Sequence, residues 1–105
     1  MNIEDYIQDL NTRATNLWVP KHALDREVVA VCIFISPKGR SFQAWLSHWN
    51  IKGVISTHFD SFISVGTSLE ESLSGLDTFI SNSEMTAAAN IKDGERIVDQ
   101  IGFTD

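Results

Sequence analysis

The sequence predicts a small α+β domain with the order α-β-β-β-α-α, in which helices pack on one face of a three-stranded antiparallel sheet. Three observations lead to this class. Apolar residues recur every three or four positions from Ile3 to Leu17, β-branched residues dominate Glu27 to Ile35, and the apolar period changes from two to nearly four across Phe62 to Leu73. A chain of 105 residues can bury one core, so we expect a single domain over residues 1–105.

The first predicted element is an amphipathic helix from Ile3 to Leu17. Its apolar stripe consists of Ile3, Tyr6, Ile7, Leu10, Ala14 and Leu17. Trp18-Val19-Pro20 should end this helix, because the residue before a proline is driven out of the α region and proline has no N–H to donate.

Residues Glu27 to Ile35 predict a strand, and their unbroken apolar character favours a central position with both faces buried. Ser36-Pro37-Lys38-Gly39 is typical of a turn, so the chain should reverse into a second strand from Arg40 to Trp49. Large side chains alternate on both faces of this second strand. The pattern therefore leaves open which face is buried, and we expect one aromatic face to be only partly covered.

A second reversal is predicted at Asn50 to Gly53. The apolar segments Val54 to Phe59 and Phe62 to Val65 follow it, either as one bulged strand or as two short strands. We favour one bulged strand, because it completes a three-stranded meander.

The second helix starts at the most distinctive junction of the chain. Thr67 or Ser68 can cap its N-terminus, with Glu70 or Glu71 completing a capping box. Its buried stripe is predicted to be Leu69, Leu73, Leu76 and Ile80. We expect this helix to break at Ser81-Asn82-Ser83. A further helical segment then covers Glu84 to Ile101, as one helix or with a separate short helix after Asp93.

The composition of the chain argues against several classes of function. The 14 acidic residues against 8 basic ones give a net charge of -6, which opposes nonspecific binding to nucleic acid. No apolar run is long enough to cross a bilayer, and the acids near Met1 do not resemble a secretory signal, so we expect a cytoplasmic protein without a membrane partner. The single cysteine, Cys32, excludes an intramolecular disulfide, and we expect it to be buried and inert.

Signatures of catalysis are missing from the sequence. It contains no Gly-x-Ser-x-Gly elbow and no glycine-rich phosphate loop. Of the three histidines, His48 and His58 could approach each other across the second and third strands, but no third ligand is forced to the same place. We therefore expect a protein that is not an enzyme, with no catalytic residue, no cofactor and no metal.

The distribution of charged residues along the chain indicates two candidate interfaces. The helical half is acidic, and its contact residues would be Glu84, Asp93, Glu95 and Asp99. Such a surface can occupy a basic groove by imitating the phosphates of a nucleic acid. The first hairpin instead combines basic and aromatic residues, namely Lys38, Arg40, Trp45, Trp49 and Lys52. This second set can stack bases and hold phosphates, and Trp45 and Trp49 can equally anchor a protein interface or belong to the core.

The segment Ile63 to Ile80, and above all Val65-Gly66-Thr67-Ser68-Leu69-Glu70-Glu71-Ser72-Leu73, is similar to the strand-to-helix segment of HicB-like antitoxins. That resemblance implies a small acidic β-β-β-α domain that binds and blocks a toxin. The order of elements from Ile3 to Ile80 also resembles double-stranded-RNA-binding domains. Those domains, however, carry lysines where this chain has Glu70 and Glu71.

The leading hypothesis is a small acidic protein that binds another protein, as an inhibitor, an antitoxin-like factor or an accessory protein of a phage or mobile element. One alternative is a nucleic-acid-binding module that uses the basic and aromatic hairpin. Another is a structural homodimer in which the exposed face or edge of the sheet pairs with a second copy.

Overall fold

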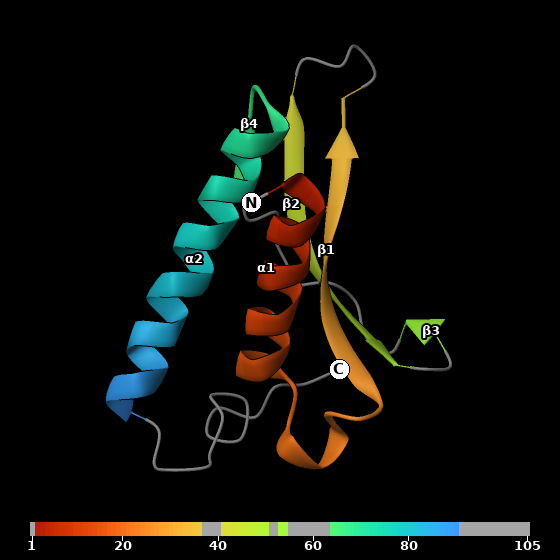
Figure 1. The fold of residues 1–105 in the computed structure, drawn as a ribbon, viewed down its shortest axis with the longest axis vertical. Coiled ribbons are helices and arrows are strands. Elements are labelled where there is room, and N and C mark those ends of the chain that lie inside the picture. Colours follow the sequence, from red (N-terminus) through yellow and green to blue (C-terminus); the bar gives the residue numbers. More distant parts are fainter. Residues whose placement is uncertain (1, 37–40, 51–52, 55–63, 91–105) are drawn as a thin grey trace.

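The fold is an antiparallel sheet with two helices (Figure 1). The computed structural model describes residues 2–36, 41–50, 53–54 and 64–90. Its elements are α1 (Ile3–Trp18), a 3-10 turn η1 (Lys21–Ala23), β1 (Glu27–Ile35), β2 (Phe42–Asn50), β3 (Gly53–Val54), β4 (Ser64–Gly66) and α2 (Leu69–Asn90). The predicted α+β class and the order helix, antiparallel strands, helix are confirmed.

The sheet is built on β2. Strand β1 pairs with β2 along its whole length, from Glu27 opposite Asn50 to Ile35 opposite Phe42, which confirms the predicted hairpin. The predicted turn residues 37–40 lie outside the described residues. Because β3 and β4 both pair with β2 as well, they share its other edge. The expectation that Glu27 to Ile35 is the central strand is therefore wrong: β2 is central and β1 is an edge strand.

The third position in the sheet is shared by two short strands. Strand β3 lies opposite Trp49 and Asn50, and β4 lies opposite Phe42, Gln43 and Ala44. Both run antiparallel to β2, as the meander requires. The expected bulge falls on residues 55–63, which lie outside the described residues.

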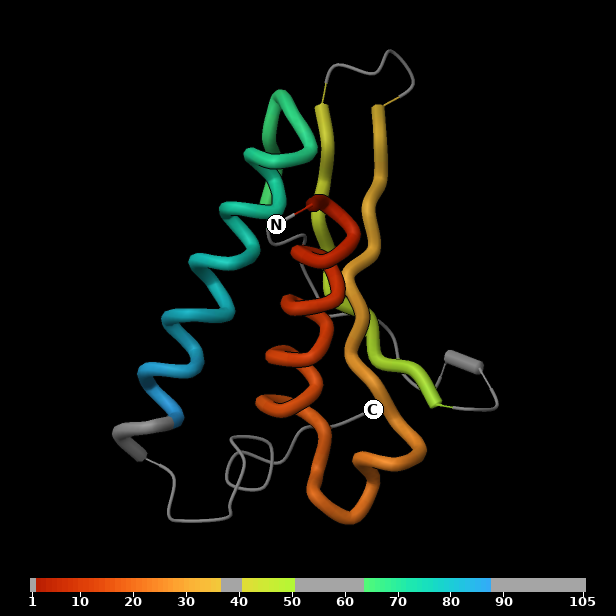
Figure 2. The backbone as a smooth tube through the Cα atoms, in the orientation of Figure 1, coloured from red at the N-terminus to blue at the C-terminus, as the bar shows by residue number. Residues whose placement is uncertain are grey.

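Both helices cover the same face of the sheet. Helix α1 lies over β1, and α2 lies beside α1 over β2 and β4 (Figures 1 and 2). The core between these layers contains Leu10, Ala14, Leu17, Trp18, Val19, Ala23, Val29, Ala44, Leu46, Leu73, Leu76, Ile80 and Ala87. Its largest side chains come from both helices and from the sheet. Detachment of either helix would therefore expose the apolar face of the sheet to water.

Helix α1 begins and ends as its sequence predicts. The Asn2 side chain caps the N-terminus by accepting a hydrogen bond of 2.8 Å from the backbone N–H of Asp5. The helix ends at Trp18, and the N–H of Val19 still donates to the carbonyl of Thr15. Pro20 follows directly, where a helical N–H would be needed.

Helix α2 has the predicted cap but not the predicted break. Ser68 is the capping residue, because its hydroxyl accepts from the N–H of Glu71 at 3.1 Å. The helix then runs without interruption through Ser81-Asn82-Ser83, so the break expected there is wrong. The hydroxyl of Ser83 donates to the carbonyl of Phe79 one turn earlier, so this serine has a hydrogen-bond partner inside the helix. Residues 91–101 of the expected third helix lie outside the described residues.

A charged cluster centred on Arg13 joins the two helices. The guanidinium donates to Glu84 at 2.8 Å, to Asp77 at 2.9 Å and to Ser81 at 2.8 Å, all on α2, and to Asp9 at 3.3 Å on α1. Its hydrogen bond with Glu84 is the main reason why the pKa of Arg13 is raised. Planar, multidentate contacts of this kind fix the angle between two helices as well as their distance.

Tyr6 extends this cluster and makes stability depend on pH. Its hydroxyl donates to Asp77 Oδ2 at 2.7 Å. Burial, and then the hydrogen bond and charge of Asp77, raise the pKa of Tyr6 from 10.0 to about 12. Burial opposes ionisation of Asp77, but hydrogen bonds from Tyr6 and Arg13 and the charge of Arg13 outweigh it and lower the pKa of this carboxyl.

We expect stability to fall at both ends of the pH scale. The raised pKa of Tyr6 stabilises the fold below pH 10, and this contribution is lost as the pH rises towards about 12. The lowered pKa of Asp77 contributes stability above its unfolded value of 3.8, which is lost as the pH falls through its folded value. Urea unfolding across pH measures both effects. Tyr6→Phe should flatten the alkaline decline, and an unchanged decline in this variant would contradict the assignment.

Candidate functional site

The two faces of the sheet differ in what covers them. Alternate residues of a strand point to opposite faces, and directly paired residues share a face. Val29, Ala44 and Leu46 therefore define the face beneath the helices. We call the opposite face the outer face, and its described members on β1, β2 and β4 are Val28, Ala30, Cys32, Phe34, Gln43, Trp45, Ser47, Trp49 and Val65.

The outer face exposes large apolar side chains. Phe34 is 55% exposed, Val65 is 45% exposed and Val28 is 41% exposed, whereas Trp45 is half-buried. Their exposure shows that the expected burial of β1 on both faces is wrong. No helix in the described part of the chain lies on this face (Figure 1). An exposed apolar patch of this kind marks an interaction surface more often than scattered single residues do.

Contacts within the outer face hold its aromatic rings in place. The rings of Phe34 and Trp45 meet edge to face, with centroids 5.7 Å apart. The indole N–H of Trp45 donates to the side-chain oxygen of Gln43 at 3.4 Å. Cys32 Sγ donates to Ser47 Oγ at 3.3 Å, and this thiol is half-buried rather than buried as expected. The face thus presents two aromatic rings in contact with each other, flanked by small neutral groups.

Among the predicted interface residues, Trp45 and Trp49 share the outer face; they are four residues apart on β2, with Ser47 between them on the same face. Glu84 does not stand free on the helical surface, since Arg13 holds it in the cluster between the helices. The other candidates lie outside the described residues. They are the acidic Asp93, Glu95 and Asp99 and the basic Lys38, Arg40 and Lys52. The structure thus brings together the two tryptophans of the predicted sets.

Sequence reasoning missed Val28, Phe34 and Val65 as surface residues. The signal for Val28 and Phe34 is that an even number of positions separates them within Glu27 to Ile35, which places them on one side of the strand. That alternation was hidden because residues on both sides are apolar.

A polar pair of a buried histidine and a half-buried glutamate lies on the inner face. His48 is 2% exposed, and its Nε2 lies 2.7 Å from Glu27 Oε1, so the two side chains bridge β2 and β1. The predicted neighbour His58 lies outside the described residues. Within the described residues, no three histidine, cysteine, aspartate or glutamate side chains are grouped to hold a metal ion. The His48–Glu27 pair therefore has a structural explanation, since each side chain gives the other a hydrogen-bond partner.

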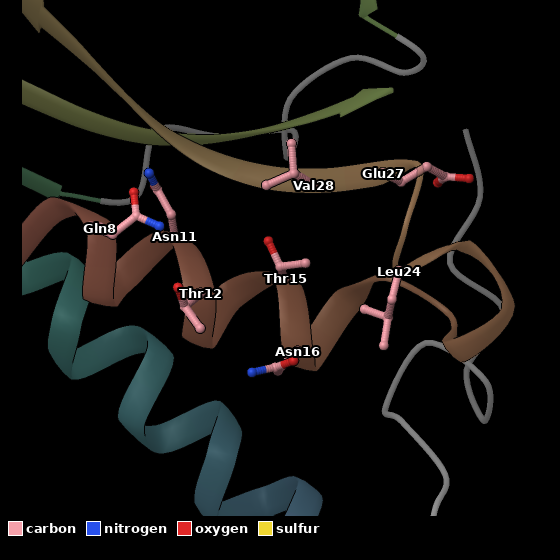
Figure 3. A pocket seen from close by; sticks show the side chains of 8 residues that line it. All are labelled: Gln8, Asn11, Thr12, Thr15, Asn16, Leu24, Glu27 and Val28. Atoms are coloured by element: carbon pink, nitrogen blue, oxygen red, sulfur yellow. The ribbon is translucent and has the colours of Figure 1, made fainter. Parts of the chain in front are cut away.

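A cleft of about 300 Å³, lined mostly by residues with polar side chains, lies between α1 and the edge of β1 (Figure 3). The amide oxygen of Asn11 accepts from the N–H of Val31 at 2.7 Å. The hydroxyl of Thr15 accepts from the N–H of Val29 at 2.9 Å and donates to its carbonyl at 3.2 Å. These helix side chains take the place of a neighbouring strand, so we call Asn11 and Thr15 the edge seal. The lining residues Asn11 and Thr15 are thus already engaged by the backbone of β1.

Comparisons of the chain with protein-family models, with curated proteins and with solved structures found no match. Neither helix of the described residues is long and apolar enough to span a bilayer.

Proposed function

We propose that this chain is a non-enzymatic protein that binds another protein through the outer face of its sheet. The observation that carries the proposal is the group of exposed apolar side chains, Val28, Phe34, Trp49 and Val65, beside the half-buried ring of Trp45. Tryptophan is among the residues that most often carry the binding energy at the centre of protein interfaces. Rings already fixed in place also lose little conformational freedom on binding.

The charge of the chain indicates what kind of partner it fits. The described members of the outer face are all uncharged, whereas the whole chain carries a net charge of -6. The best complement is a protein surface with an apolar centre and a basic surround, because opposite net charges raise the rate of encounter. Such a partner fits an inhibitor or antitoxin-like role, in which the bound protein is blocked while the complex lasts.

The other binding modes have weaker support in the described residues. A nucleic-acid mimic would use the acidic residues of α2 and beyond, but Glu84 is engaged by Arg13. A nucleic-acid-binding hairpin needs its three basic residues, Lys38, Arg40 and Lys52, beside the tryptophans. The described residues supply only Trp45 and Trp49 of that set, both of which the proposed protein interface also uses.

The test is co-purification of tagged protein from its native host after nuclease treatment, followed by affinity measurements with the recovered protein. We expect Trp49→Ala to weaken binding about tenfold or more, as loss of an interface anchor does. Met85→Ala is the matched control, because Met85 is 70% exposed on α2, away from the sheet. Equal affinity for both variants would contradict the proposal. Recovery of nucleic acid instead of protein would favour the basic hairpin.

A further inference from the structure

The edge of β1 is sealed over only part of its length. The N–H groups of Val29 and Val31 point away from β2 and are bound by Thr15 and Asn11 of α1. The N–H of Ser36 points the other way, to the carbonyl of Ser41 at 3.0 Å. Backbone N–H and C=O groups point alternately to the two edges of a strand. The odd-numbered residues of β1 therefore direct theirs to the edge away from β2.

Beyond the edge seal, Ile33 and Ile35 therefore direct their backbone groups away from the sheet. The upper end of β1 extends past the start of α1, and no described strand lies along its edge away from β2 (Figures 1 and 2). Its side chains are apolar and open to solvent: Phe34 is 55% exposed and Ile35 is 60% exposed. An apolar edge strand with unpaired backbone groups is a template for pairing with another strand.

We propose that this free end of β1 pairs antiparallel with β1 of a second copy of the chain. The edge seal determines the register. A pairing centred on Ile33 would place Val31 opposite Ile35 of the second copy, but the N–H of Val31 is already bound to Asn11. A pairing centred on Phe34 places Ile33 opposite Ile35 and uses only backbone groups that the helix leaves open.

This second register also matches side chains across the two-fold axis. Phe34 meets its own copy on the outer face, and Ile33 meets Ile35 of the copy on the helix side. Cross-strand aromatic and β-branched pairs of this kind stabilise sheets. The segment from Val28 to Ser36 carries no charge, so the two chains can approach there despite a net charge of -6 on each. The sheet becomes continuous through both copies, with their outer faces side by side.

The short ladder predicts a weak dimer, because four backbone hydrogen bonds and a few side chains bury far less than a standard interface. Sedimentation of the purified protein alone, up to submillimolar concentration, should show a monomer–dimer equilibrium. Phe34→Lys puts two like charges opposite each other and should weaken association about tenfold or more. Val28→Lys adds the same charge to the same face at the sealed end and should leave association unchanged.

Two further variants test the backbone register. Ile35→Pro removes an N–H that points to the free edge while leaving the β1–β2 ladder intact, so it should yield a folded monomer by circular dichroism and sedimentation. In a Cys32→Ser background, Phe34→Cys should oxidise to a disulfide dimer, since directly opposite Cα atoms of a non-hydrogen-bonded pair lie about 4.5 Å apart. Val28→Cys should remain monomeric.

A monomer at every concentration would overturn this proposal. So would a dimer that Phe34→Lys and Ile35→Pro both leave intact, because it would have to use another surface. Since these measurements involve the chain alone, their outcome is independent of the search for a protein partner.

Discussion

Replacing Leu76 with alanine is expected to lower the free energy of unfolding by about 2–5 kcal/mol, the usual cost of truncating a large buried side chain. Leu76 is fully buried on α2, in the core between both helices and the sheet. The loss combines the transfer free energy of the removed atoms with the cavity left behind. The packed surroundings cannot close this cavity completely, because Leu46 and Leu73 in the same core are fully buried as well.

The matched control for Leu76→Ala lies on the same helix. Met85 is 70% exposed, so Met85→Ala removes a side chain of similar size with little change in burial. We expect its effect to stay within about 0.5 kcal/mol in urea unfolding. Similar losses for the two variants would contradict the placement of the Leu76 stripe against the sheet.

The second large effect is expected at Gly75, where α2 crosses β4. A Cβ atom at this position would overlap Ser64 Oγ and would lie 3.0 Å from Ser64 Cβ. The contact with Oγ is closer than real Cβ atoms allow, and the tight contact with Cβ cannot be relieved by turning the Ser64 side chain. We expect Gly75→Ala to destabilise the fold by about 1–3 kcal/mol through overpacking. This would occur although alanine favours a helix by about 1 kcal/mol over glycine.

A double-mutant cycle isolates this contact. Ser64→Gly removes both atoms that a new Cβ would meet, so the double variant should be more stable than the sum of the two single changes predicts. Additive losses would mean that Gly75 is required for a reason other than its closeness to Ser64. Urea unfolding of the four proteins measures the coupling directly.

The regular elements could be predicted because local patterns determine them. Pro20 and the Ser68-to-Glu71 cap mark helix ends by their own chemistry, and both predicted ends agree with the structure. The continuity of α2 through Ser81-Asn82-Ser83 could not be predicted in this way. Ser81 receives a hydrogen bond from Arg13 of α1, a residue far away in the sequence, and no local pattern reports such a partner.

The position of β1 was mistaken for a related reason. An apolar strand with a helix sealing its edge has the same composition as a strand buried in the middle of a sheet. Only the pairing partners tell the two apart, and the edge seal of Asn11 and Thr15 depends on how α1 is placed. The candidate surface was predictable in part. Residue type alone indicates Trp45 and Trp49, whereas the exposure of Phe34 depends on which face the helices cover.

The edge seal also affects how the chain avoids aggregation during its synthesis. The hydrogen bonds from Val29 to Thr15 and from Val31 to Asn11 join residues only 14 and 20 positions apart. Closing so short a loop costs little entropy, so the helix can protect the β-branched segment once that segment leaves the ribosome. Strand β2 has not yet emerged from the ribosome at that moment. We therefore expect α1 to act as a temporary neighbour that keeps nascent chains from pairing with one another before the hairpin is complete.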